Sequence, residues 1–471
     1  MTASLARLVF PALRWRRGSF AHERAKIDQT LAAGVGGFIL FGGTREAVAT
    51  LTADLRAQAG RPLLIGADLE RGAGQQVHGL TELPPAAALG ALDDLDATHA
   101  AALITATEAL SVGLNWAFAP VCDLDIEPEN PIIQTRSFGA DPQRVGEQAA
   151  VWVRGCQEHG VLACAKHYPG HGRTTQDSHA TVPRVVTPFA QLAGEDLGPF
   201  EFAIRAGVGS MMAAYVSYPG WDASGRAAAF SPPILGYLRD PLNFSGFVVT
   251  DALIMGGATA TEAEAPATVT ALAAGCDGLL YPEDFAGVIA ALDAAVGRDI
   301  LTARADGALA RYEQAIGEWG RGKGEGEVDL GANAQFGDQL ARRALRWVRG
   351  EKPKLGASVK VTVVDDDAGG PYTVGSRAVF AQTLRSLGKR TTDNGQRIAL
   401  LFANPLSWKG HADLSAPSRA ALRRLVPGAA LVVLCGHPRL AAQIPGRAPV
   451  LCAWGGDAVM QRAAARAISG D

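Results

Sequence analysis

Histidines are concentrated in one short stretch of the chain, KHYPGHGRTTQDSH, which begins at Lys166 and holds three of the nine histidines. The first two, His167 and His171, have the i, i+4 spacing of metal ligands on one face of a helix. Pro169 and Gly170 lie between them and break any helix, so this geometry is not available. The sequence therefore predicts no metal ion here.

Asp177 and His179 are separated by one residue at the polar end of the same stretch. A carboxylate beside an imidazole raises the pKa of the histidine and orients its ring. Such a pair can donate and accept a proton near neutral pH, as general acid–base catalysis requires. For His171, which lies between two glycines, two interpretations stay open: it satisfies backbone groups of the loop, or it belongs to a functional site.

The elements that must position these residues are indicated by eight short apolar runs. Each run is continuously apolar instead of alternating, which is typical of parallel strands buried on both faces. Helical patterns lie between the runs, for example over 144–160, 196–208 and 265–275. This alternation predicts a TIM-type (β/α)8 barrel, with a doubly wound open sheet as the alternative. No GxGxxG follows the first run, which weakens that alternative. The runs span residues 5–13, 36–42, 62–70, 115–125, 161–170, 210–220, 246–254 and 276–284.

Reactive side chains should appear where the strands of such a barrel end, because its active sites lie at the carboxyl-terminal rim. They do appear there: Asp68, Asp123 with Asp125, and Asp251 each fall near the end of an apolar run, as do Lys166 and His167. Burying a carboxylate at a strand end costs free energy, so we expect it to be paired with another group or to take part in function. Asp251 could supply the nucleophile that the Asp177 and His179 pair lacks.

These residues resemble a known family. KHYPGHGRTTQDSH is similar to the signature of family 3 glycoside hydrolases, in the β-N-acetylglucosaminidase branch, and VVTDALIMGG is similar to the nucleophile segment of that family. GGFILFGG, FAPVCDLD, RSFGADP and AGCDGLLYPED have counterparts in the same order. The resemblance covers about residues 5–315. The DSH element separates this branch from the β-glucosidases.

The resemblance implies a role for each matching residue. Asp251 corresponds to the catalytic nucleophile, His179 to the general acid/base and Asp177 to its partner. Charged and imidazole groups can also bind sugar hydroxyls through hydrogen bonds that strengthen in the transition state. For Arg136, a surface salt bridge is the alternative interpretation. The positions that correspond to sugar-binding residues are Asp68, Arg136, Lys166 and His167.

Three departures from the family pattern concern substrate recognition. Where the family often reads DQEGGRVQR, this chain reads DLERGAGQQV, and Arg71 need not replace the later arginine. Tyr215 stands where the family often has a histidine, and Ala252 stands where a second aspartate often follows the nucleophile. The predicted catalytic trio is not affected.

The remainder of the chain predicts a second domain. Residues 321–355 begin as a Gly-rich, charged linker and then turn helical. Four buried strands, separated by helical stretches, follow within 356–471, which indicates a small α/β domain with a parallel sheet. We therefore expect a barrel over 1–320, a linker with a helix over 321–355 and the second domain over 356–471. The loop DDDAGGPY, from Asp365, is either an ordinary turn or reaches toward the barrel mouth.

Composition limits the possible partners and the compartment. A net charge of −3 offers no electrostatic case for binding nucleic acid. No apolar run reaches the roughly 18 residues that a membrane span requires, and the N-terminal stretch lacks the order of a signal peptide. The six cysteines form no CxxC pair and lie mostly in apolar runs, so they are interpreted as reduced and buried. These features predict a cytoplasmic protein.

The resemblance implies a retaining hydrolase that releases terminal, non-reducing β-linked N-acetylglucosamine and needs neither metal nor organic cofactor. In bacteria such an enzyme serves muropeptide recycling, so the expected substrate is a small N-acetylglucosaminide such as a muropeptide fragment. Two alternatives remain at this stage. One is a β-N-acetylglucosaminide phosphorylase, because a histidine acid/base repels phosphate less than a carboxylate would. The other is a non-catalytic sugar-binding relative.

Overall fold

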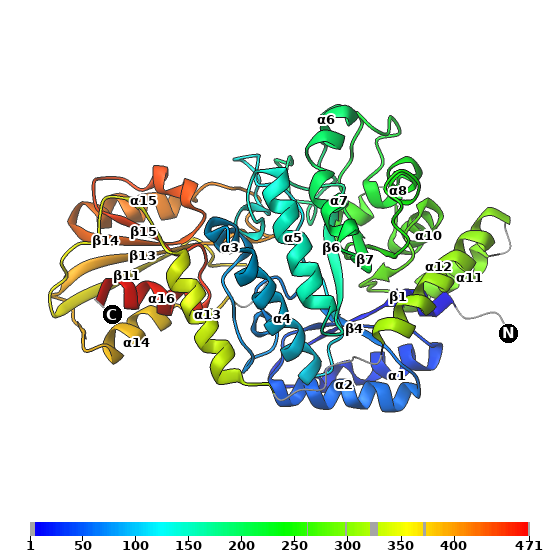
Figure 1. Cartoon of the computed structure of the whole chain (residues 1–471), viewed down its shortest axis with the longest axis horizontal. Coiled ribbons are helices and arrows are strands. Elements are labelled where there is room, and N and C mark those ends of the chain that lie inside the picture. The colour runs from blue at the N-terminus through cyan, green and yellow to red at the C-terminus, as the bar shows by residue number, and fades with distance from the viewer. Residues whose placement is uncertain (1–4, 261, 297–298, 321–327, 371–373, 470–471) are drawn as a thin grey trace.

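A computed structural model of the chain describes residues 5–260, 262–296, 299–320, 328–370 and 374–469. Two sheets lie at opposite ends of the molecule, one inside a ring of helices and one flanked by fewer helices (Figure 1). The Gly-rich start of the predicted linker falls on 321–327, outside the described residues.

The larger sheet is a closed barrel of parallel strands in chain order. Seven strands, β2 to β8, form one ladder, and β1 pairs with β9. A bridge between Val249 and Gly278 joins β8 to the β9 segment, and β1 continues into β2 across Pro11, so the ring closes. The predicted barrel is confirmed and the open doubly wound sheet is wrong. The strands are β1 (Val9–Phe10), β2 (Ala12–Arg14), β3 (Gly37–Phe41), β4 (Leu64–Ala67), β5 (Trp116–Ala117), β6 (Leu162–Tyr168), β7 (Ser210–Ala213), β8 (Phe247–Thr250) and β9 (Leu279–Leu280).

Helices follow the strands and cover the outside of the barrel. The helix predicted from residue 144 is α5, which begins at Pro142, and the side chain of Asp141 caps it by accepting from the Arg144 N–H at 2.9 Å. The other two predicted helices are α7 and α10. The helices of this part are α1 (Arg24–Ala33), α2 (Arg45–Ala59), α3 (Ala86–Leu92), α4 (Leu95–Ser111), α5 (Pro142–Gln157), α6 (Phe189–Gly194), α7 (Gly198–Arg205), α8 (Pro232–Arg239), α9 (Gly256–Thr259), α10 (Glu264–Ala274), α11 (Phe285–Ala295) and α12 (Asp299–Trp319).

The barrel interior is filled by side chains, as the continuously apolar runs predict. Within the ring, Phe10 meets Trp116 and Phe247 edge to face, and Trp116 meets Phe247 at a tilt, at centroid distances of 5.2 to 6.1 Å. The indole N–H of Trp116 donates to Ser210 at 2.9 Å, which satisfies its polar atom inside this core. Because the interior is solid, a substrate can reach only the rim.

The second sheet has six strands in the order β12-β11-β13-β14-β15-β10. All neighbours are parallel except β10 and β15, so the predicted parallel α/β unit is confirmed. The four predicted strands are β11, β13, β14 and β15, whereas β10 and β12 are additional short strands. The elements are α13 (Leu330–Ala344), β10 (Arg346–Arg349), β11 (Ser358–Asp365), α14 (Val379–Ser386), β12 (Arg390–Thr391), β13 (Gln396–Ala403), α15 (Ala416–Leu425), β14 (Ala429–Gly436), β15 (Val450–Cys452) and α16 (Ala458–Ser469).

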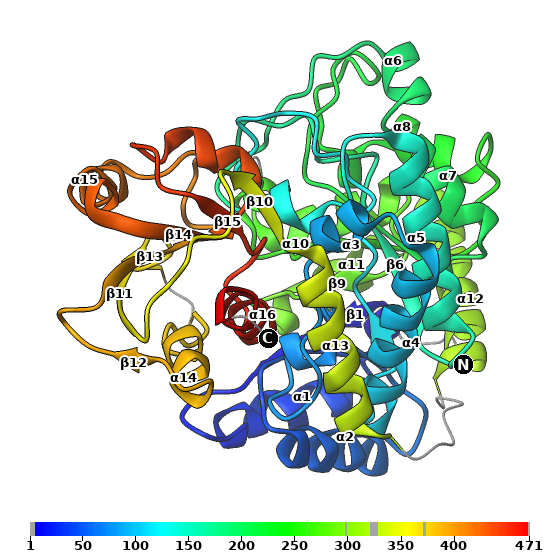
Figure 2. The same ribbon diagram turned by 60° about the vertical axis from the view of Figure 1, so that its left-hand side comes forward.

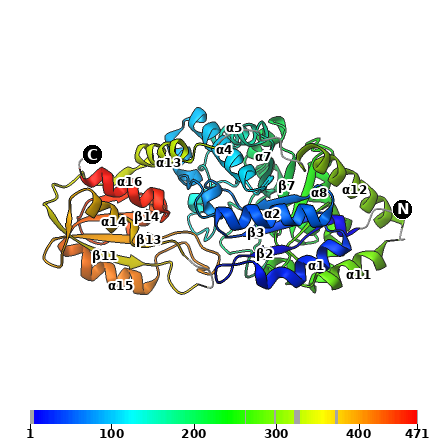
Figure 3. The ribbon, with the colours of Figure 1, turned by 90° about the horizontal axis from the view of Figure 1, so that it is seen from below.

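Helix α13 lies between the barrel and the second sheet, packed against α16 on one side and α3 and α4 on the other (Figures 2 and 3). Strand β10, which belongs to the second sheet, lies within the stretch predicted to be the linker. The domain limits at 320 and 355 stay a prediction. The six cysteines are free and buried. In the described part of the chain, no helix is long and apolar enough to cross a membrane.

Candidate active site

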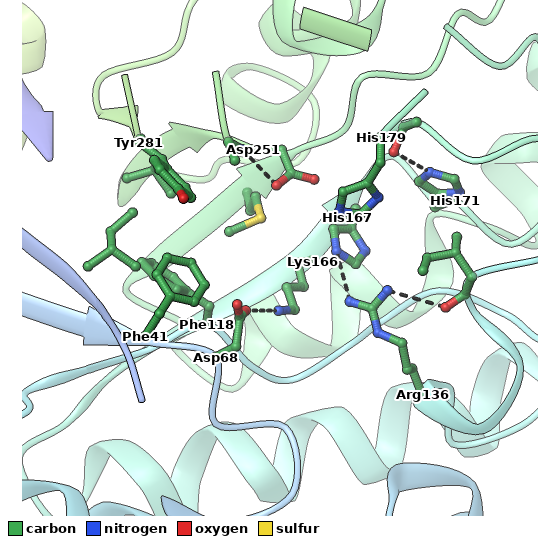
Figure 4. Close-up of a pocket in the computed structure, with 16 residues that line it drawn as sticks. Phe41, Asp68, Phe118, Arg136, Lys166, His167, His171, His179, Asp251 and Tyr281 are labelled. Carbon is green, nitrogen blue, oxygen red and sulfur yellow. Dashed lines mark hydrogen bonds and ion pairs between the residues drawn. The ribbon is translucent and has the colours of Figure 1, made fainter. Parts of the chain in front are cut away.

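The side chain of Asp251 stands at the rim, directly after β8. Its Oδ1 accepts from the N–H of Ala252 at 2.7 Å, and it lines a pocket at the carboxyl end of the barrel strands. The hydroxyl of Tyr215, a fully buried residue, donates to the Asp251 carbonyl at 3.2 Å. Figure 4 shows Asp251 on one side of this pocket and Asp68 on the other. The carboxylate is therefore held in place yet open to a bound molecule.

Asp177 and His179 form the predicted pair. Nδ1 of His179 lies 2.7 Å from Oδ1 of Asp177, which also accepts the His179 backbone N–H at 2.9 Å. Only 2% of the Asp177 side chain is exposed, against 40% of the His179 side chain. The carboxylate thus lies behind the ring and accepts a hydrogen bond from Nδ1–H, so Nε2 is left to exchange protons at the pocket.

The electrostatics of the pair favour a protonated histidine. Burial alone would lower the pKa of His179, but the hydrogen bond to Asp177 and the charges of Asp177 and Asp251 outweigh it and raise the pKa above 6.5. Burial likewise opposes ionisation of Asp177, yet His179 lowers the pKa of this carboxyl below its ordinary value. The site therefore holds a proton donor beside an ionised carboxylate.

The segment after Asp251 supports the histidine loop directly. The N–H of Gly256 donates to the His179 carbonyl and that of Gly257 to the Ser178 carbonyl, both at 2.9 Å. A Cβ at Gly257 would lie 2.8 Å from the Ser178 carbonyl oxygen. The two glycines of VVTDALIMGG thus let the histidine loop lie directly against the segment that carries Asp251.

Four charged groups form one network on the other side of the pocket. Lys166, whose side chain is 2% exposed, lies 2.7 Å from both Asp68 and Glu70. Glu70 also accepts from Arg136 at 2.8 and 3.0 Å. Burial opposes each charge, but the opposite charges keep the pKa of Glu70 well below its ordinary value and that of Lys166 above it. Arg136 therefore pairs inside the pocket and not on the outer surface.

His167 is oriented by Asp123. Its Nδ1 lies 2.6 Å from Oδ2 of Asp123, whose other oxygen accepts the backbone N–H groups of His171 at 2.6 Å and His167 at 3.2 Å. Nε2 of His167 is left toward the pocket, 3.5 Å from Nη2 of Arg136. The sequence marked Asp123 as a strand-end carboxylate but did not reveal its partner.

His171 combines the two interpretations that the sequence left open. It is buried, with Nε2 2.9 Å from the Ser178 hydroxyl and Nδ1 2.8 Å from the Thr174 hydroxyl, and it also lines the pocket. Burial lowers the pKa of His171 to about 4. The ring is therefore neutral near pH 7 and fixes the loop by hydrogen bonds.

An aromatic wall completes the mouth of the pocket. Phe41 ends β3 and Tyr281 follows β9, and their rings lie 5.4 Å apart. The guanidinium of Arg14, at the end of β2, lies 5.2 Å from the Phe41 ring and 5.0 Å from the Tyr281 ring. Sequence reasoning missed all three, although each stands at a strand end.

The remaining expectations for the pocket concern Arg71 and metal ions. Arg71 donates two hydrogen bonds to Asp457 of the second sheet unit, at 2.6 and 2.7 Å, and does not line the pocket. Among the residues that the structure describes, no three His, Cys, Asp or Glu side chains group as metal ligands do.

The rim of this closed (β/α)8 barrel holds an accessible carboxylate, a histidine that is hydrogen-bonded to a second carboxylate, and a charged wall that can bind hydroxyl groups. Glycosidases combine these features. The family model described as the glycosyl hydrolase family 3 N-terminal domain matches residues 7–312. The chain belongs to glycosyl hydrolase family 3.

Two curated relatives agree with the branch that the sequence resembles. A β-hexosaminidase of Chromobacterium violaceum is 38% identical over 284 residues, 57% of this chain and 78% of that protein. One of Stenotrophomonas maltophilia is 39% identical, over 62% of this chain and 88% of that protein. The predicted family and its β-N-acetylhexosaminidase branch are confirmed, and the alternative of a non-catalytic sugar-binding relative is not supported.

The likeness to solved structures extends over both sheets. A family 3 β-N-acetylglucosaminidase from Paenibacillus has a TM-score of 0.87 at 26% identity and covers 99% of this chain and 96% of its own. A β-glucoside phosphorylase has the same TM-score at 20% identity and covers 99% of this chain and 91% of its own. At 20% identity, this second likeness shows the fold alone.

Proposed function

We propose that this enzyme releases terminal, non-reducing β-linked N-acetylglucosamine with retention of configuration. Asp251 is the nucleophile, His179 the general acid/base and Asp177 its partner. The observation that carries the proposal is the packing of the Asp177 and His179 pair directly on the segment that carries Asp251. The backbone after Asp251 thus fixes the position of the acid/base pair relative to the nucleophile.

The geometry supports the following sequence of steps. Asp251 attacks the anomeric carbon and forms a glycosyl ester, while Nε2 of His179 gives its proton to the departing glycosidic oxygen. His179, now neutral, then takes a proton from water as the water attacks the ester and frees Asp251. Asp177 stabilises the imidazolium in the first step and keeps Nδ1 protonated throughout.

The charged wall is the proposed binding site for the sugar hydroxyls. Asp68, Lys166 and His167 turn polar atoms toward the pocket, and Arg136 adds a guanidinium at the same place (Figure 4). Their mutual ion pairs hold these groups in position before the substrate binds, which reduces the free energy needed to order them. Hydrogen bonds from such groups strengthen as charge develops on the sugar ring.

We propose a cytoplasmic location for the enzyme. We further propose that the aglycone of its substrate carries a carboxylate, as a muropeptide fragment does. Arg14 is paired in register with Phe41, and Ala12 with Ile39. Registered neighbours in parallel strands point to the same face, and both Ile39 and Phe41 line the pocket. Arg14 therefore places a cation beside the Phe41 and Tyr281 rings of the pocket wall, where it could pair with a carboxylate of the substrate.

The test of this function is turnover of 4-nitrophenyl β-N-acetylglucosaminide and of a β-linked N-acetylglucosaminyl disaccharide, with and without phosphate. A hydrolase yields free N-acetylglucosamine at a rate independent of phosphate. The remaining alternative, a phosphorylase, requires phosphate and yields the sugar 1-phosphate. Loss of turnover on every β-hexosaminide by well-folded protein would contradict the proposal.

A further inference from the structure

An arginine of the second sheet unit reaches the rim of the barrel. Arg439 lies just after β14, and its Nη1 donates to the carbonyls of Glu127 at 3.2 Å and Pro128 at 3.1 Å. Its Nη2 pairs with Asp125. His437 supports this contact, with Nδ1 accepting from Nε of Arg439 at 2.8 Å and Nε2 3.0 Å from Asp125. One guanidinium thus holds three points of a barrel loop.

The loop that Arg439 holds, residues 125–136, is joined to the histidine loop through Asn130. This side chain is 1% exposed and donates to the carbonyls of His171 at 3.0 Å and Gly172 at 3.3 Å. Its Oδ1 accepts the N–H groups of Ile132 at 2.9 Å and Ile133 at 2.7 Å. Asn130 therefore transmits the position of the loop to the stretch that ends in His179.

The same loop ends at Arg136, which contacts Glu70 and lies beside His167 in the pocket. Asp125 is also two residues from Asp123, the carboxylate that orients His167. Displacement of residues 125–136 would move both the sugar-binding wall and the acid/base loop. The hydrogen bond from Arg346 to the Ala91 carbonyl at 2.7 Å also joins the two units, but it is not made to residues 125–136.

We propose that Arg439 is a positioning residue for the reaction: the second sheet unit uses it to hold residues 125–136, and through them Arg136 and His179, in their working places. Arg439 does not line the pocket. Its effect is exerted through Asp125, the loop carbonyls and Asn130. The proposal rests on the acid/base role proposed for His179.

The test compares Arg439→Ala with Arg346→Ala, which also removes an arginine contact between the units. With an N-acetylglucosaminyl disaccharide as substrate, we expect kcat/KM of Arg439→Ala to fall by about 10- to 100-fold, since small misplacements cost that much. KM should rise because Arg136 moves, and kcat should fall because His179 moves. Arg346→Ala should stay within about twofold of the wild type. Arg439→Lys, which keeps the charge beside Asp125, should recover part of the loss.

Azide supplies a readout that lost stability alone would not change. Azide attacks the glycosyl ester without a general base, so it should speed turnover of an aryl glycoside by Arg439→Ala and leave Arg346→Ala unaffected. His179→Ala is the reference. If azide fails to rescue His179→Ala, the proposed function is wrong. If azide rescues His179→Ala while Arg439→Ala matches the wild type in kcat, KM and azide response, the positioning role is overturned. If Arg439→Ala does not fold, Arg439→Gln, which can still donate one hydrogen bond to the loop carbonyls, carries the same comparison.

Discussion

The carboxylate of Glu70 lies 2.7 Å from the ammonium group of Lys166, and it accepts two further hydrogen bonds from Arg136. Glu70 is thus the anion between two cations that line the pocket, Lys166 and Arg136. Lys166 is almost fully buried, so its charge depends on this neighbour and on Asp68. Breaking a buried ion pair by removing one partner leaves a charge without compensation.

Glu70→Gln should therefore destabilise the protein and weaken substrate binding. The shape of the side chain is kept, but the buried Lys166 and the half-buried Arg136 would lose the anion between them, and the free energy of unfolding should fall by about 3 kcal/mol. Urea denaturation measures this change, and KM should rise in parallel. Glu201→Gln, which breaks an exposed pair with Arg205, should change stability by no more than about 0.5 kcal/mol. Equal losses in the two variants would contradict the role given to Glu70.

The fold could be predicted because its strands carry a local signal. Each continuously apolar run becomes a barrel strand, since burial on both faces leaves no place for polar residues. The positions of Asp68, Lys166 and Asp251 could also be predicted, because barrel strands end at a common rim. Strands β10 and β12 are the two edges of the second sheet, are partly exposed and contain arginines, so they lack a continuous apolar run.

Contacts between residues that are far apart in the sequence could not be predicted in the same way. Glu70 lies two residues after Asp68, but its contacts with Lys166 and Arg136 exist only once separate strands and loops meet. Arg439 is about 300 residues from the loop that it holds, and no local pattern marks it. The need for a residue without a side chain at Gly257 likewise becomes visible only in the folded chain, where the Ser178 carbonyl lies against it.

Asp251→Asn should abolish hydrolysis, because an amide cannot form the glycosyl ester and no other group replaces it. The matched control is Asp240→Asn, at the exposed end of α8, which should keep wild-type turnover. Wild-type enzyme quenched during turnover of an activated aryl glycoside should gain the mass of one N-acetylglucosaminyl group, and proteolysis should locate it on Asp251. A label on a different residue would refute the assignment.

His179→Ala should separate the two steps of the reaction. A phenolate with electron-withdrawing groups leaves without an acid, so the variant should still form the intermediate from an activated aryl glycoside and then stall, because water needs the base. We expect a burst of phenol followed by slow turnover, which azide accelerates with formation of a β-glycosyl azide. Near-normal rates on disaccharides would mean that another residue is the acid.

Gly257→Ala should lower activity without unfolding the enzyme. The added methyl group would lie 2.8 Å from the Ser178 carbonyl oxygen and 2.8 Å from the Tyr215 Cβ, so the histidine loop must shift away from Asp251. A fall in kcat of about 100-fold is the expected scale for such a displacement. Gly236→Ala, in α8 with nothing within 4 Å of the new methyl group, is the control and should be neutral or slightly stabilising.

The pH dependence of the enzyme should follow the Asp177 and His179 pair. The pKa of His179 is raised, so the pair stabilises the fold below the unfolded value of 6.5, and this stabilisation is lost as pH rises through the raised pKa. The pKa of Asp177 is lowered, so its contribution is present above the unfolded value of 3.8 and is lost as pH falls through the lowered pKa. The ion pair therefore contributes most between these two unfolded values.

Asp177→Asn should shift the alkaline limb of kcat/KM to lower pH. The first step needs protonated His179, so activity on a disaccharide falls as pH rises through the pKa of this residue in the free enzyme. Without the Asp177 carboxylate, burial lowers that pKa with less opposition, and only the charge of Asp251 still raises it. The measurement is kcat/KM from pH 5 to 9 for both proteins, with an activated aryl glycoside as the control, because its first step needs little acid. An unchanged alkaline limb in Asp177→Asn would show that a group other than His179 sets it.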